Sequence, residues 1–316
     1  MSHITKHLFS LFALSVLLIT ALPSHAASIS LNSTAENGSD LFTGELLETS
    51  CAKVGVVMYH GRGSTPTGPV VEEIRTSLNR AGYTTLSIDN PIPLDGQILF
   101  SSYVTDSDVG GDDYVFPETY ARMRTAINHL QTLGVEEVVV AGFSLGSRLA
   151  TAHVARGQMD ELPILGLIGV GMYGTSIDPL NISATIDEVS VPVLDLYGDA
   201  DTNAANTAAA RLAAYNTGAG LDYTQTEFIC IGGLNCHQLE GLKGDDSMML
   251  EVNVNAWMQA VAPASLVSGC TPPGAVLPVT PPPAATPSSG SGALNVYLTL
   301  LFLLLLPVLR AGLFDS

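Results

Sequence analysis

Short, continuously apolar segments alternate along this chain with segments whose apolar residues recur at helical spacing. The predicted strands are 54–59, 83–88, 137–141, 163–170, 191–197 and 221–231, and the predicted helices are 69–80, 117–134, one from about 144, 204–216 and 247–261. Strands that are apolar at every position are typical of a parallel sheet covered on both faces. With right-handed crossovers, the alternation predicts an α/β fold with a mostly parallel, doubly wound sheet flanked by helices.

Two regions fit this pattern less clearly. Residues 28–50 predict one or two edge strands, such as 28–31 and 44–48. In the last helix we expect Val252, Ala256 and Ala260 to face inward. Asp195 lies inside an otherwise apolar strand, where a charge needs a partner or a place at the sheet edge.

The most informative motif joins strand 137–141 to the helix that follows. Gly142-Phe143-Ser144-Leu145-Gly146 is a Gly-x-Ser-x-Gly sequence at a strand–turn–helix corner, which is typical of a nucleophile elbow. Such a turn raises the Ser144 hydroxyl above the carboxyl end of the sheet. Its glycines are needed because a Cβ would collide with the neighbouring strand or helix.

A serine hydroxyl needs a general base, and that base needs a carboxylate to hold its tautomer. His237 follows the last predicted strand and is the predicted base. Asp199 and Asp201 both follow strand 191–197, at the edge where Ser144 lies, so either could be the acid. The other histidines beyond residue 26 lie in an upstream loop or on helices: His60, His129 and His153.

Residues 53–261 resemble the serine hydrolases of the α/β-hydrolase fold, which carry their triad in the order Ser…Asp…His. The family places its acid three residues after a strand-ending glycine, which here favours Asp201 over Asp199. The resemblance also implies an oxyanion hole formed by the backbone N–H of Leu145 and by the loop His60-Gly61-Arg62-Gly63. Arg62 is the better match in that loop and Gly61 is its neighbour. The short stretch 171–190 leaves no room for a large cap domain.

The ends of the chain predict export. Residues 1–26 have a weakly basic start, an apolar run and a small-residue cleavage site, as a secretory signal peptide does. Residues 27–267 form the predicted hydrolase domain, and 268–292 a Pro/Ser/Gly-rich linker. Residues 293–316 are hydrophobic and, with the Ser-Gly repeat before them, resemble GlyGly-CTERM sorting segments. The alternative is a plain transmembrane anchor. The expected partners are the export machinery and an intramembrane sorting protease, and the expected location is the periplasm, cell surface or extracellular space.

The exported part contains four cysteines, which predicts two disulfides. Cys230 and Cys236 are close in sequence and are expected to pair, which leaves Cys51 with Cys270. Because Cys236 precedes His237, we expect reduction to loosen the base and lower turnover. The spacings form no Cys-x-x-Cys pairs, and the chain has no dinucleotide or phosphate-loop motif, so we expect no metal and no cofactor.

Net charge narrows the range of partners. At −18, with a pI near 4.5, the chain repels nucleic acids and anionic membranes. The acidic insert 90–116 lacks the bidentate glutamate of a calcium loop and is expected to be a solvated loop, a lid or a substrate rim. The sequence therefore predicts a monomeric, exported serine hydrolase that cleaves small-molecule esters or related acyl bonds. A serine peptidase, an acyltransferase and a catalytically silent surface binding protein are the alternatives.

Overall fold

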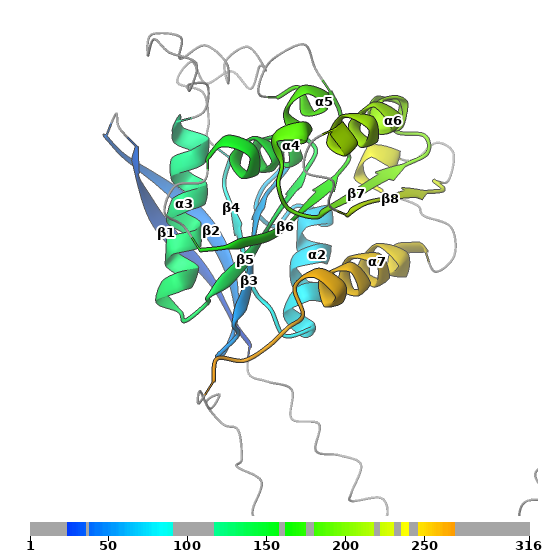
Figure 1. Cartoon of the computed structure of the whole chain (residues 1–316). Coiled ribbons are helices and arrows are strands. Elements are labelled where there is room, and N and C mark those ends of the chain that lie inside the picture. The colour runs from blue at the N-terminus through cyan, green and yellow to red at the C-terminus, as the bar shows by residue number, and fades with distance from the viewer. Residues whose placement is uncertain are drawn as a thin grey trace, which may run out of the picture. The chain divides into compact units, whose positions relative to one another are not determined.

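The computed structural model describes residues 24–35, 38–90, 117–157, 162–174, 180–217, 222–230, 235–239 and 246–268 (Figure 1). Residues 1–23 of the predicted signal peptide, residues 91–116 of the acidic insert, most of the linker and the whole C-terminal segment lie outside these ranges. Within the described ranges, every helix is too short or too polar to span a bilayer.

The described strands form one eight-stranded sheet in the order β1-β2-β4-β3-β5-β6-β7-β8. Strand β2 pairs antiparallel with both β1 and β4, and every other pair is parallel. The strand bounds are β1 Ser24–Ala35, β2 Gly38–Thr49, β3 Val54–Tyr59, β4 Thr84–Ile88, β5 Glu137–Phe143, β6 Ile164–Val170, β7 Val193–Gly198 and β8 Tyr223–Phe228. The predicted mostly parallel α/β sheet is confirmed.

Helices cover both faces of the sheet. Figure 1 shows α3, α4, α5 and α6 on one face and α2 and α7 on the other. Successive strand residues enter the two cores in turn, as the pleat requires: Val57 packs on the α3 face and Val56 on the α2 face. The helix bounds are α2 Pro69–Arg80, α3 Pro117–Thr132, α4 Leu145–Ala152, a π-turn η2 His153–Gly157, α5 Ile182–Thr185, η3 Ile186–Glu188, α6 Thr202–Thr217, η4 Cys236–Gln238 and α7 Asp246–Val261.

Two expectations about local structure were wrong. The N-terminal strands β1 and β2 are longer than predicted, and β2 lies between β1 and β4 rather than at an edge. In α7 the inward face was misassigned: Val252 is 58% exposed, and Ala256 and Ala260 are exposed as well, whereas Val254 and Met258 are buried. Buried Trp257 reaches Gly166 of β6, where an added Cβ would lie 2.5 Å from the indole ring.

The charge inside β7 has a fully buried counter-charge and two partly buried hydrogen-bond donors. The Arg211 guanidinium of α6 donates from Nε to Asp195 Oδ2 over 2.9 Å and from Nη2 to Oδ1 over 3.1 Å. Tyr223 and Gln225 of β8 donate to Oδ2 over 2.8 and 2.9 Å. Burial raises the pKa of Asp195, and the Arg211 charge acts in the opposite direction.

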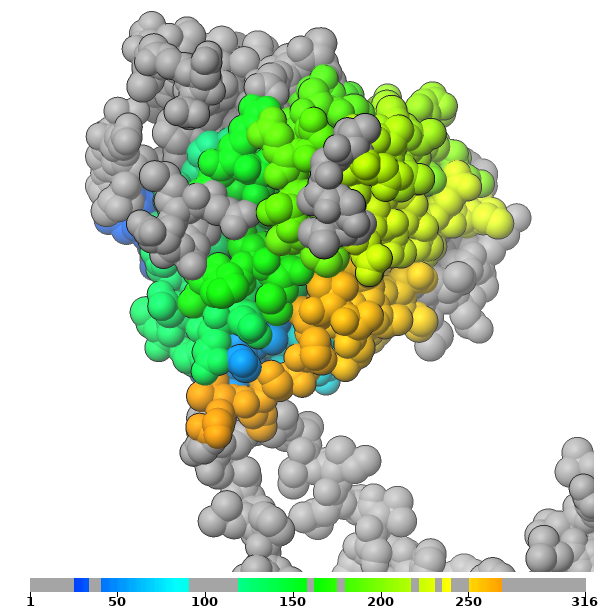
Figure 2. Space-filling view, in the orientation of Figure 1, coloured from blue at the N-terminus to red at the C-terminus, as the bar shows by residue number. Residues whose placement is uncertain are grey.

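After α7 the chain returns to the start of β3. Lys53 N–H donates to Ser265 O over 2.7 Å, and Val267 N–H donates to Cys51 O over 2.9 Å. In Figure 2 this orange segment runs along the lower end of the visible face, beside earlier parts of the chain in blue and green. Cys51 is disulfide-bonded; Cys270, its predicted partner, lies outside the described residues.

Candidate active site

Ser144 lies at a sharp turn between β5 and α4. Its backbone has φ 56° and ψ −116°, outside the regions that a residue with a side chain normally adopts. Two close approaches explain the flanking glycines. A Cβ on Gly142 would lie 2.2 Å from Gly146 O, and one on Gly146 would lie 2.3 Å from Tyr59 O. The turn therefore holds the hydroxyl at the carboxyl end of the sheet.

The structure brings the three predicted triad side chains together. His237, in the short helix η4, has Nε2 2.7 Å from Ser144 Oγ and Nδ1 2.6 Å from Asp201 Oδ2. Asp201 follows β7, and its side chain is only 4% exposed, against 31% for His237. The second Asp201 oxygen accepts a long hydrogen bond from Ala204 N–H, 3.4 Å away at the start of α6. Asp199 takes no part in this chain of contacts.

Three residues that the sequence analysis did not select surround the His237 ring. The Phe143 ring lies 5.2 Å from it and the Tyr173 ring 6.2 Å, edge-on. Gly171 has φ 61°, and an added Cβ would lie 3.0 Å from His237 Cε1. The one signal in the sequence was a glycine directly after the apolar strand that ends at Val170.

A buried arginine packs against one of these residues, Tyr173. Arg148, on α4 four residues after Ser144, places its Cζ 3.3 Å from the centre of the Tyr173 ring. Burial, together with the neighbouring Arg62 charge, lowers the pKa of Arg148 to about 9. Tyr173 therefore neighbours both a buried cation and the candidate base.

The predicted oxyanion loop approaches the elbow. An added Cβ on Gly61 would lie 3.3 Å from Ser144 Cβ. Asn90 Nδ2 donates to His60 O over 2.7 Å, which anchors the loop to the end of β4. A hydrogen bond with His60 lowers the pKa of the neighbouring Asp89 carboxyl.

The two residues predicted to supply the oxyanion N–H groups differ in their overall exposure. Arg62 is exposed and Leu145 is buried. The N–H of Leu145 opens helix α4, where the first amides have no partner within the helix and favour an anion.

Within the described residues, one group could offer three ligand atoms to a metal. Asp199, Cys230 and Cys236 bring these atoms within 4.8 Å of one another. Cys230 and Cys236 form a disulfide, however, and metal binding by cysteine requires a thiolate. The oxidised form therefore lacks two of the three ligands.

The chain matches one family of known sequences. Residues 15–233 match the sequence model of a family described as "Protein of unknown function (DUF3530)". A search of curated proteins gives no significant match.

Similar solved structures include an esterase from Pyrococcus furiosus, at 12% identity and a TM-score of 0.53 over 76% of this chain and 92% of that one. A dienelactone hydrolase from Anabaena variabilis aligns at 18% identity and a TM-score of 0.50 over 75% and 98%. The thermostable carboxylesterase EstE1, cloned from a metagenomic library, aligns at 13% identity and a TM-score of 0.52 over 81% and 96%. At these identities the likeness concerns the fold alone, which is that of the α/β-hydrolases.

Proposed function

The chain belongs to the DUF3530 family of proteins of unknown function, and from the arrangement of its site we propose that it is an exported serine hydrolase that cleaves carboxylic esters. One observation carries the proposal: a continuous hydrogen-bonded path runs from Ser144 Oγ through both nitrogens of His237 to Asp201. A hydroxyl at a strained turn, a partly exposed imidazole and a buried carboxylate are the parts that nucleophilic acyl transfer requires.

In the proposed mechanism, His237 Nε2 takes the proton of Ser144 as the oxygen attacks the ester carbonyl. Asp201 accepts a hydrogen bond from Nδ1–H, which keeps Nε2 free of its proton and stabilises the imidazolium that forms. The alcohol then leaves with the proton from Nε2. Water, activated by the same imidazole, hydrolyses the acyl-Ser144 ester and restores the enzyme.

The tetrahedral intermediates carry a negative charge on oxygen. We propose that the backbone N–H groups of Leu145 and Arg62 stabilise it, with Gly61 as the alternative donor. The approach of the Gly61 backbone to Ser144 supports this assignment. The anchoring of His60 O by Asn90 supports it too, because donors fixed in advance need no reorganisation during the reaction.

The choice of carboxylic esters rests on the solved structures of similar fold, whose titles describe esterases, a carboxylesterase and a dienelactone hydrolase. Export rests on residues 1–26 and on the disulfide-bonded cysteines, since disulfides persist in oxidising compartments.

A fluorophosphonate probe and a chain-length series of nitrophenyl esters test the proposal. We expect the full-length protein to be labelled at Ser144 and to hydrolyse at least one ester. Ser144→Ala should abolish both, with a fall in kcat of about 10⁴-fold or more. Ser30→Ala, on the exposed face of β1, is the matched control and should change neither. Full esterase activity in Ser144→Ala would falsify the mechanism, and cleavage of peptides without esters would reassign the substrate.

A further inference from the structure

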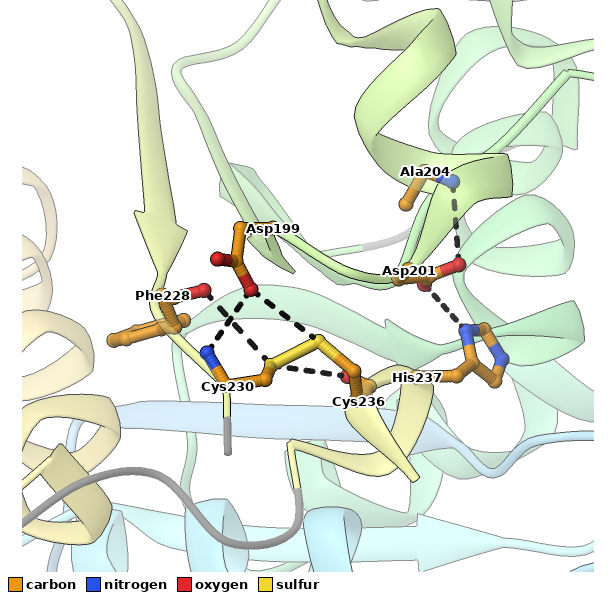
Figure 3. The surroundings of a disulfide bond; sticks show 7 residues. All are labelled: Asp199, Asp201, Ala204, Phe228, Cys230, Cys236 and His237. Atoms are coloured by element: carbon orange, nitrogen blue, oxygen red, sulfur yellow. Dashed lines mark hydrogen bonds and ion pairs between the residues drawn. A yellow bond between two sulfur atoms is a disulfide. The ribbon is translucent and has the colours of Figure 1, made fainter. Parts of the chain in front are cut away.

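The disulfide between Cys230 and Cys236 lies directly on Gly198, the last residue of β7. A Cβ added to Gly198 would stand 2.2 Å from Cys236 Sγ and 2.6 Å from Cys230 Sγ, so the bridge fills the space of a side chain. Asp201 N–H donates to Gly198 O over 3.1 Å. The bridge therefore packs on the turn that carries the proposed catalytic acid, as Figure 3 shows.

Asp199 connects that turn to both cysteines. Its backbone N–H donates to Phe228 O over 2.8 Å, and its Oδ1 accepts from Cys230 N–H over 3.0 Å. Cys236 Sγ lies 3.9 Å from the same oxygen. Figure 3 shows the Asp199 carboxylate directed at the bridge, while Asp201 is directed at His237. The two candidate acids thus face different partners.

Resting on the proposed function, we infer that Asp199 and the Cys230–Cys236 bridge form a clamp that positions His237 for catalysis. Cys236 immediately precedes His237, so packing Cys236 against Gly198 also holds the backbone of His237 in place. The ring must meet Ser144 and Asp201 at the same time, and a displacement of about 1 Å can lower a rate about 100-fold. The clamp therefore holds the His237 backbone against the turn that carries Asp201.

Hydrolysis then depends on the oxidation state of the bridge. A dithiol reductant supplies two electrons and two protons to the sulfurs of Cys230 and Cys236 and is itself oxidised to a cyclic disulfide. The bridged cysteines are only 6 positions apart, and short loops contribute the least loop-closure entropy to stability. Reduction is therefore expected to release His237 while the domain stays folded.

The chain has four cysteines, which allows a matched pair of variants. Cys51→Ala with Cys270→Ala leaves only the clamp bridge, and Cys230→Ala with Cys236→Ala removes it. Steady-state ester hydrolysis is measured for each full-length protein with and without dithiol, with circular dichroism to confirm folding. In the first variant we expect dithiol to lower kcat about tenfold or more while KM changes less than about threefold. In the second, kcat starts at the lowered value and dithiol has no effect.

Asp199 supplies a second measurement that does not require removal of the bridge. Asp199→Ala loses the acceptor for Cys230 N–H and should lower kcat, whereas Asp199→Asn keeps an acceptor oxygen and should restore it. Full kcat in the folded first variant, with its bridge shown to be reduced, overturns the inference and leaves the proposed function standing. Equal kcat in Asp199→Ala and wild type removes Asp199 from the clamp. A wild-type protein that hydrolyses no ester overturns the proposed function and this inference with it.

Discussion

Gly171 lies against the His237 ring and leaves no space there for a side chain. It follows β6 with φ 61°, where residues with a side chain are rarely found. A Cβ there would lie 3.0 Å from His237 Cε1 and 3.1 Å from Nδ1, closer than carbon and nitrogen normally approach. A side chain at this position would push the imidazole away from Ser144 and Asp201.

Gly171→Ala is therefore expected to lower kcat about tenfold or more, because the displaced ring no longer meets both partners. Gly134→Ala is the control: Gly134 also has a positive φ, of 90°, but an added Cβ would meet nothing within 4 Å. Both variants should lose about 1–2 kcal/mol of stability from the left-handed backbone. Ester kinetics and urea denaturation separate the two effects, and an unchanged kcat in folded Gly171→Ala would contradict the argument.

At the residue scale, chain order and spacing were enough to predict which side chains meet at the candidate site. The contacts predicted among Ser144, His237 and Asp201 are present, and their catalytic role stays a prediction tested by Ser144→Ala. Gly171 and Tyr173 were missed because their proximity to His237 arises only when β6 and the loop after β8 come together. Nothing local in the sequence marks such tertiary neighbours.

At the scale of elements, one buried ion pair links β7 to α6, and two residues of β8 donate hydrogen bonds to its carboxylate. The side chains of Asp195 and Arg211 are both 0% exposed, with Arg211 Nη2 2.8 Å from Asp195 Oδ2. Arg211 Nη1 also donates to Ala204 O over 2.9 Å, within the first turn of α6. That turn directly follows Asp201, so the pair supports the helix next to the proposed catalytic acid.

Arg211→Met removes the guanidinium and leaves the Asp195 carboxylate buried without its counter-charge. We expect a loss of about 3–5 kcal/mol in the free energy of unfolding, measured by urea denaturation. Adding Asp195→Asn to Arg211→Met should recover part of this loss, because the amide carries no charge and still accepts from Tyr223 and Gln225. A double variant less stable than Arg211→Met would show that the buried charge is not the cause.

The buried faces of strands and helices were predicted correctly where the hydrophobic pattern allows only one interpretation. Strands β3 and β5 are almost entirely buried, and their continuous apolar sequences indicated this. Helix α7 was harder because Val252 and Val254 lie on different faces of an apolar helix. The buried face was decided by packing, which seats Trp257 against Gly166 of β6. Asp195 was unexplained because its partner, Arg211, lies on α6, the next helix.

At the scale of the whole molecule, the alternation of strands and helices was enough to predict the fold class. The alternation does not show that the segment after α7 closes onto the start of β3, because short irregular segments have no periodicity. Only the expected pairing of Cys51 with Cys270 pointed to this contact. Ala52 and Leu266 form an antiparallel bridge there. The signal peptide, the linker and the C-terminal sorting segment stay predictions.

Two truncations measure what this closure contributes. Chains ending after Ser268 or after Ala262, both carrying Cys51→Ala, lack Cys270 and differ in residues 263–268. The longer chain keeps the hydrogen bonds from Lys53 N–H to Ser265 O and from Val267 N–H to Cys51 O, and the shorter chain loses both. Each backbone hydrogen bond contributes about 1 kcal/mol to the stability of the domain. The shorter chain also loses the β-bridge between Ala52 and Leu266.

We therefore expect the chain ending at Ala262 to melt about 4–8 °C below the chain ending at Ser268. Ester kcat at 25 °C should be the same for both, because residues 51–53 precede β3, whereas the site lies at the carboxyl ends of the strands. Calorimetry and steady-state kinetics test both parts. Equal melting temperatures would mean that the returning segment does not stabilise the domain, and a selective loss of kcat would mean that it acts on the site.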